Sequence, residues 1–139
     1  MALITEAGTP LVSDPGYHVV RQARAAGIKV VPVPGACALI AALSAAGLPS
    51  DRFIFEGFLP AKTAGRRARP EQVREEPRTL IFYEAPHRIL ECLPAMQAVL
   101  RDERPALLAP GITHPLHRSE GRPPGRPSHF RGSLHPFTI

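Results

Sequence analysis

The chain has 139 residues, a net charge of +5 and an isoelectric point near 10, and this length allows one small domain with a buried core. No apolar run approaches the ~20 residues that a membrane-spanning helix needs, and the start resembles no secretory signal. Cys37 and Cys92 form no CxxC pair, which argues against structural zinc and fits reduced thiols. We therefore expect a cytoplasmic protein with no metal and no membrane partner.

The positive charge is unevenly distributed along the sequence. Residues 110–139 contain four arginines and one acid, Glu120, so this stretch alone contributes +3 and leaves +2 for the rest of the chain. Clustered cations favour nucleic acid because they release phosphate counterions. Here the charge alone is a weak indication of such a partner.

Apolar runs alternate with segments of helical spacing from the amino terminus to Ala109. We expect short strands, in chain order, at residues 2–5, 28–31, 53–55, 79–83 and 105–109. We expect helices at residues 16–26 and 36–46, closed by Gly27 and Gly47, and one from Pro86 to about Leu100. Strands that alternate with helices indicate an α/β fold. Residues 110–139 show neither period and are rich in proline, so we expect an irregular or disordered tail.

Two turns follow expected strands and open helices, which is where open α/β sheets bind ligands. The first spans Ala7 to Gly16, with Gly8 for close backbone approach and Thr9 and Ser13 as hydroxyls; it matches neither a GxGxxG nor a Walker loop. The alternative is a rigid turn in which Ser13 or Asp14 caps the next helix.

The second turn spans residues 33–38, where N–H groups at the start of a helix suit a carboxylate. The alternative is a plain turn that lets small residues pack closely. Two such turns together favour a shared cleft.

Two further segments carry charged groups. Lys62, Arg66, Arg67 and Arg69 follow an aromatic, glycine-containing loop, which suits phosphate and base contacts, although short basic runs are commonly solvated surface. Glu84 and His87 follow the strand at 79–83 and offer an acid and a base. The alternative there is a turn in which Arg88 pairs with a carboxylate.

Five segments can be compared with known families by their order and spacing. They are residues 6–16, 34–35, 43–49, 55–60 and 78–88. Together they resemble the small-subunit ribosomal RNA methyltransferases of the tetrapyrrole methylase superfamily, over Met1 to about Ala109. A Gly-Asp-Pro turn is expected in corrin-pathway members, so the Ala-Gly-Thr-Pro turn at residues 7–10 favours the ribosomal RNA branch.

The resemblance implies methyl transfer from S-adenosylmethionine to the ribose 2′-oxygen of a cytidine in small-subunit ribosomal RNA. It also implies a homodimer and two α/β domains with the cofactor between them. The implied cofactor residues are Ala7, Gly8, Thr9, Pro10, Pro34, Gly35, Ala36, Cys37, Ala38, Tyr83 and Glu84. The basic residues Lys62, Arg66, Arg67 and Arg69 are expected to contact RNA. Glu6, Glu84 and His87 are candidates for the base that removes the ribose proton, and no one of them stands out.

The same comparison implies differences at both ends of the chain, and it implies a helix after Gly65 in which Pro70 is unusual. The family has a strand and a Pro-Ile-Gly-Asn type loop before the position of Met1, and an Arg-Glu-Leu sequence where Pro110 begins here. We hypothesise a one-base insertion near the Ala109 codon. We expect the end of a first α/β domain at residues 1–35, part of a second at 36–109 and the tail at 110–139, with impaired activity. A non-catalytic RNA-binding fragment and a methylase of a corrin-type small molecule are the alternatives.

Overall fold

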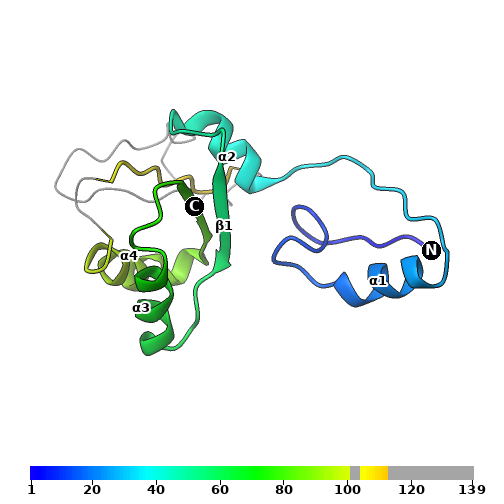
Figure 1. Cartoon of the computed structure of the whole chain (residues 1–139), viewed down its shortest axis with the longest axis horizontal. Helices are drawn as coiled ribbons and strands as arrows, with labels where there is room; N and C mark the ends of the chain where they lie inside the picture. Colours follow the sequence, from blue (N-terminus) through cyan, green and yellow to red (C-terminus); the bar gives the residue numbers. More distant parts are fainter. Residues whose placement is uncertain (101–103, 113–139) are drawn as a thin grey trace, which may run out of the picture.

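The computed structural model describes residues 1–100 and 104–112 (Figure 1). In chain order the elements are α1 (Tyr17–Ala25), α2 (Ala38–Ala46), β1 (Phe53–Phe58), α3 (Thr63–Gln72), β2 (Thr79–Tyr83), the 3₁₀ helix η1 (Pro86–Arg88) and α4 (Ile89–Gln97). The α/β class expected from the sequence is confirmed. Most of the expected tail, residues 113–139, lies outside the described residues.

The two strands form a parallel sheet with α3 as the connection between them. Parallel strands need such a crossover because the chain must return to the same end of the sheet. The register runs from Phe53 opposite Thr79 to Phe58 opposite Tyr83, with an irregularity between Phe55 and Gly57. Both strands therefore end at the same edge, which is the edge that carries the candidate site.

Helices cover both faces of this sheet. On one face Leu80 and Phe82 pack with α4 residues Cys92 and Met96. On the other face Ile81, which is fully buried, packs with Leu39 and Leu43 of α2. Alternate residues of β2 thus serve two cores, which explains why residues 80–82 in the middle of the predicted strand are all apolar.

The ends of the helices follow the predicted signals closely. Gly47, at φ 64°, ends α2 in the left-handed conformation that glycine adopts readily. Pro86 opens η1, and the chain continues as α4 to Gln97, slightly short of the predicted end. The helix expected after Gly65 begins at Thr63 and includes Pro70, whose side chain is buried.

Three of the five predicted strands are wrong or reduced. Residues 2–5 and 28–31 have no strand structure, and of residues 105–109 only Leu108 makes an isolated bridge. A strand is stable only when its N–H and C=O groups pair with a neighbouring strand. Residues 2–5 and 28–31 are almost entirely exposed, with Ile4 at 85% and Val31 at 64% exposure. Their apolar pattern is that of a strand, but the described residues offer them no sheet to join.

The first 36 residues form an arm beside the sheet (Figure 1). Its helix α1 has no buried residue, although the expected helix at 16–26 is confirmed. The arm meets the core through the turn before α1, since Val12 packs against the cluster of Leu39, Leu43 and Ile81. This contact places the first turn next to the ends of the strands.

Candidate functional site

A cleft of about 410 Å³ lies at the carboxyl ends of β1 and β2. The cleft is lined by the first turn, the start of α2, the ends of both strands and the segment after Leu108. The lining residues are Ala7, Gly8, Thr9, Val12, Ser13, Asp14, Ala38, Phe58, Tyr83, Glu84, Ala109, Gly111 and Ile112. A volume of this size suits a small organic ligand.

The first turn is held in an unusual backbone conformation. Leu11 and Ser13 have positive φ values of 72° and 54° although neither is glycine. Such conformations are strained for residues with a Cβ atom, and they persist where the surrounding structure fixes them. Here the Thr9 hydroxyl donates to the carbonyl oxygen of Ala36 at 3.0 Å, which ties the first turn to the second.

The sheet approaches the first turn most closely at Gly57. This residue sits at the irregularity of β1 with φ +68°, and a Cβ atom there would lie 2.9 Å from the Ser13 hydroxyl oxygen. Glycine is therefore needed both for the backbone conformation and for the contact. The strand irregularity and the turn fit each other.

Tyr83 joins the end of β2 to the start of α2. The backbone N–H of Leu39 donates to the Tyr83 hydroxyl oxygen at 3.0 Å, and the ring packs edge-on against Phe55 and Phe58. Burial raises the pKa of this hydroxyl, with Leu39 acting against the shift. Tyr83 thus stays protonated and acts as a cap for α2, which has no side-chain cap of its own.

The structure brings six of the eleven predicted cofactor residues to the cleft. They are Ala7, Gly8, Thr9, Ala38, Tyr83 and Glu84. Pro10, Pro34, Gly35, Ala36 and Cys37 are not among its lining residues. The second turn reaches the cleft only through Ala38 because residues 32–36 are an exposed extended segment leading into α2.

Sequence reasoning missed several lining residues. Ser13 was expected either as a hydroxyl of the first turn or, like Asp14, as a helix cap. In the structure α1 begins after Gly16 without any side-chain cap, and both residues line the cleft. Their place in the glycine-rich turn was the signal that could have identified them. Ala109 ends an expected strand, and Gly111 and Ile112 lie in the segment without periodic pattern, so the sequence offers no comparable signal for a site at these residues.

The three candidate bases differ in their surroundings. Glu6 and His87 are exposed and do not line the cleft. The side chain of Glu84 is only 1% exposed and pairs with Arg88, whose Nε lies 3.4 Å from Glu84 Oε1. A buried, paired carboxylate is poorly placed to reach a substrate proton, and this geometry matches the alternative of a turn held by Arg88.

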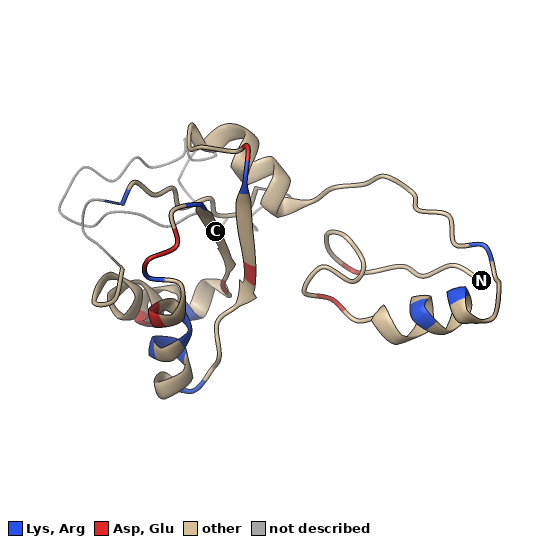
Figure 2. Cartoon of the chain, viewed as in Figure 1, with Lys and Arg blue, Asp and Glu red and all other residues tan. Residues whose placement is uncertain are grey.

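The predicted RNA-binding residues also separate into two groups. The Arg66 side chain is 8% exposed and bonded to Glu91, and Arg69 pairs at 2.5 Å with the buried Glu56 carboxylate. Arg66 is therefore not available to RNA, because burial leaves its guanidinium group no open surface. Lys62 and Arg67 are exposed, and Figure 2 shows Lys and Arg on α3 and on α1.

Residues 1–100 and 104–112 contain neither a metal-binding cluster nor a membrane-spanning helix. No cluster of three or more His, Cys, Asp or Glu side chains is arranged there to hold a metal ion. No helix in this part of the chain has the length and apolar character needed to cross a membrane.

Comparison with known proteins gives a consistent result. Residues 1–119 match the family described as Tetrapyrrole (Corrin/Porphyrin) Methylases. A Pseudomonas aeruginosa protein named ribosomal RNA small subunit methyltransferase I is 75% identical over 109 residues, which cover 78% of this chain and 39% of that protein. Proteins of the same name from Haemophilus influenzae and Escherichia coli O157:H7 are 63% and 57% identical, over 81% and 90% of this chain and 40% and 44% of theirs. The chain thus spans about two fifths of the length of these relatives.

Proposed function

Because the chain belongs to the tetrapyrrole (corrin/porphyrin) methylase family, we propose that its cleft binds S-adenosylmethionine and serves methylation of small-subunit ribosomal RNA. The observation that carries this proposal is the convergence of the first turn, the start of α2 and the end of β2 on one cleft. These segments are far apart in sequence, and the family resemblance implied all three as cofactor residues. The cytoplasm, where reduced thiols persist, is the compartment that we propose.

The groups around the cleft fit the chemistry of this cofactor. Its carboxylate suits the amino-terminal end of α2, where the helix dipole is positive and Ala38 lines the cleft. Its apolar parts suit Val12 and Phe58, and its hydroxyl and amino groups suit the turn residues Ser13 and Asp14. A pocket with mainly apolar walls and a few polar groups is typical of cofactor sites.

The chain's own contribution to the reaction would be positioning. S-adenosylmethionine supplies an electrophilic methyl group, and an oxygen nucleophile must approach it in line. Holding two reactants in this geometry accounts for a large part of the barrier reduction. Asp14 is the half-buried carboxylate on the cleft wall, and we propose it as a further candidate to accept the substrate proton, next to Glu6 and His87.

Ribosomal RNA is the substrate that we favour over a corrin-type small molecule. The similar proteins reported above carry the ribosomal RNA name, and the Ala7–Pro10 turn has the form expected for that branch. Exposed Lys62 and Arg67 would contact phosphates. The cytidine 2′-oxygen as methyl acceptor and the homodimer remain predictions from the family resemblance.

The two exposed cations also support a second function, that of a non-catalytic RNA-binding fragment. The two functions differ in what the chain binds. A fragment of this kind would bind small-subunit RNA with a steep salt dependence and would not bind the cofactor. A corrin-type substrate would bind the cleft and leave RNA binding weak.

Calorimetric titration with S-adenosylmethionine tests the proposal, with two glycines as matched variants. Gly8 and Gly27 both have positive φ values, +73° and +71°, and both have open space around an added Cβ atom. Both alanine substitutions therefore introduce similar strain, but only Gly8 lines the cleft. We expect cofactor binding to the wild-type chain and to Gly27→Ala, and weakened binding to Gly8→Ala. A folded wild-type chain that binds RNA but no cofactor would instead support the RNA-binding fragment.

A further inference from the structure

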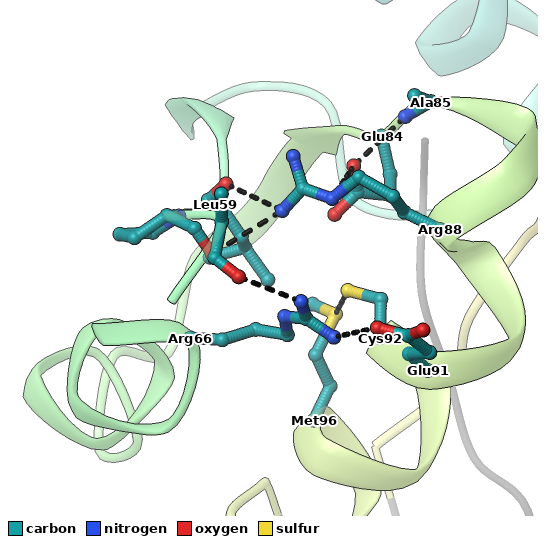
Figure 3. Close-up of polar contacts among 10 residues, drawn as sticks. Leu59, Arg66, Glu84, Ala85, Arg88, Glu91, Cys92 and Met96 are labelled. Atoms are coloured by element: carbon teal, nitrogen blue, oxygen red, sulfur yellow. Dashed lines mark hydrogen bonds and ion pairs between the residues drawn. The ribbon is translucent and has the colours of Figure 1, made fainter. Parts of the chain in front are cut away.

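Two arginines hold the segment that connects β1 to α3. Its three consecutive carbonyl oxygens, at Leu59, Pro60 and Ala61, each accept a hydrogen bond from a guanidinium group. Arg88 Nη2 lies 3.0 Å from Leu59 O and 3.2 Å from Pro60 O, and Arg66 Nη2 lies 2.8 Å from Ala61 O. Figure 3 shows both guanidinium groups turned toward this segment from different elements. Neither arginine was predicted to have this role.

Arg88 also contacts the end of β2. Its Nε lies 3.4 Å from Glu84 Oε1, and the same carboxylate oxygen accepts the backbone N–H of Ala85 at 2.8 Å. A buried carboxylate is tolerated only with a compensating charge or hydrogen bonds. The neighbouring Cys92 stays a neutral thiol and adds no second negative charge, because burial, with a contribution from Glu84, raises its pKa to about 11. Arg88 is therefore the cation that compensates Glu84.

These contacts link the two strand ends that form one wall of the cleft. Leu59 directly follows Phe58 of β1, and Glu84 directly follows Tyr83 of β2, and three of these four residues line the cleft. The Glu84 carboxylate is buried, although the residue as a whole is half-buried. Glu84 therefore presents its backbone to the cleft, and its side chain lies beneath the wall with Arg88.

We propose that Arg88 is a positioning residue of the cofactor cleft, which fixes the ends of β1 and β2 relative to one another through Leu59, Pro60 and Glu84. This inference rests on the proposed function for its link to S-adenosylmethionine. One planar guanidinium group donates to both carbonyl oxygens through Nη2, and its Nε forms an ion pair, without a hydrogen bond, with the Glu84 carboxylate. Without it, the wall would have to compensate a buried charge by moving.

Arg66 provides the matched control. It is more deeply buried than Arg88, with 8% against 21% side-chain exposure, and its Nη1 donates to Glu91 Oε2 at 2.9 Å. Its contacts connect α3, the same loop and α4, but neither Ala61 nor Glu91 lines the cleft. Loss of Arg66 should therefore lower stability without altering the cleft wall.

The experiment compares Arg88→Gln, Arg88→Lys and Arg66→Gln in the full chain. Cofactor affinity is measured by calorimetry at a temperature at which each variant is folded by circular dichroism. We expect Arg88→Gln to weaken S-adenosylmethionine binding by about tenfold or more, as for loss of a charge-assisted hydrogen bond. Arg88→Lys keeps the charge but not the fork, so its affinity should be intermediate. Arg66→Gln should bind within about twofold of the wild type, and an equal loss in Arg66→Gln and Arg88→Gln would overturn the proposal.

Amide chemical shifts without cofactor give a second readout. Arg88→Gln should shift residues at both strand ends, 57–60 and 82–85, whereas Arg66→Gln should shift residues near Ala61 and in α4. If the wild type binds no cofactor, the proposed function fails for this chain, and the shifts still decide the role of Arg88. Unchanged chemical shifts at the strand ends in Arg88→Gln would contradict the proposed role of Arg88. If Arg88→Gln does not fold, Arg88→Lys decides by the same criteria.

Discussion

Gly57 is a position where the sheet and the first turn constrain each other. An added methyl group meets the Ser13 hydroxyl oxygen at 2.9 Å, and the φ of +68° is strained for any residue with a Cβ atom. We expect Gly57→Ala to destabilise the chain by about 1–3 kcal/mol and to weaken cofactor binding as well. Urea unfolding and calorimetry measure the two effects. Gly47 is the control, because it has φ +64° and open space around an added Cβ atom. Gly47→Ala should lower stability and leave cofactor binding unchanged. Equal effects of the two variants on binding would argue against a role for the contact between Gly57 and Ser13.

The two cysteines should differ in reactivity. Cys92 is 1% exposed, and burial, with a contribution from Glu84, raises its pKa to about 11, whereas Cys37 is half-buried. Because the thiolate is the reactive form, we expect a disulfide reagent at pH 8 to modify Cys37 and to leave Cys92 unmodified in the folded chain. The Cys37→Ser variant should show no fast reaction until urea is added. Rapid modification of Cys92 in that variant without urea would contradict the buried position.

Arg66 illustrates what the sequence could not predict at this scale. Its neighbours are basic and polar, and arginine is rarely buried, so a basic surface was the natural interpretation. The structure buries it because Ala61 and Glu91, 5 and 25 residues away, supply acceptors. A partner 25 residues away leaves no local pattern. Gly8 of the first turn, by contrast, was singled out from the sequence, because a glycine between a strand and a helix indicates a local backbone requirement.

At the scale of single elements, β2 carries the packing of the sheet. Ile81 is fully buried against α2 and lies in the same cluster as Val12 and Tyr83. We expect Ile81→Ala to lower the free energy of unfolding by about 2–5 kcal/mol and Ile81→Val by about 0.5–1.5 kcal/mol. Leu90 on α4 is 81% exposed, so Leu90→Ala should change stability by no more than about 0.5 kcal/mol. Chemical denaturation compares all three, and a similar cost for Leu90→Ala and Ile81→Ala would show that the packing is different.

The loop between α3 and β2 should give an acid-dependent contribution to stability. Hydrogen bonds from the Arg78 side chain lower the pKa of Glu76 from its ordinary value of 4.5 to about 2. A carboxyl group with a lowered folded-state pKa stabilises the fold above its unfolded pKa, and this contribution is lost as the pH falls through the folded value. We therefore expect part of the acid destabilisation between about pH 4.5 and 2 to disappear in Glu76→Gln. Unfolding midpoints recorded as a function of pH measure this acid destabilisation. The Arg78→Gln variant should show the same pH profile as Glu76→Gln. Two different profiles would mean that Glu76 and Arg78 do not stabilise the fold through their mutual contact.

Secondary structure was predictable where an element carries its own stabilising contacts. The helices α1, α2 and α4 satisfy their own backbone groups, and their spacing and terminal glycine or proline identified them. The strands β1 and β2 were predicted because each is an apolar run. The prediction is confirmed because the two runs pair with each other. Residues 28–31 also carry an apolar pattern, but a strand depends on a neighbour that the pattern does not supply.

For the molecule as a whole, the cleft connects sequence, fold and proposed function. Its walls come from segments at residues 7–14, 38, 58, 83–84 and 109–112, and the parallel sheet brings them to one edge. The sequence predicted the turns as cofactor residues through the family resemblance and not through spacing. It did not predict Ala109, Gly111 and Ile112, because their place depends on the path of the chain after α4.

The arm carries exposed apolar side chains. Ile4, Val31 and Val33 are 85%, 64% and 88% exposed, and unpaired apolar segments of this kind favour association between chains. The chain spans about two fifths of the length of its similar proteins. Cofactor and RNA measurements should therefore be made at low protein concentration, where association is weakest.

The most direct test of the central claim maps cofactor-induced amide shifts on the isotope-labelled chain. If the cleft is the cofactor site, S-adenosylmethionine should shift the amides of Gly8, Thr9, Ala38, Tyr83 and Glu84, which line it. The amides of α3, at Thr63–Gln72 on the opposite side of the sheet from α2, should stay unchanged. Saturable shifts confined to the cleft are the predicted result. Shifts confined to α3, or no shifts in a chain that gives a folded spectrum, would contradict the account.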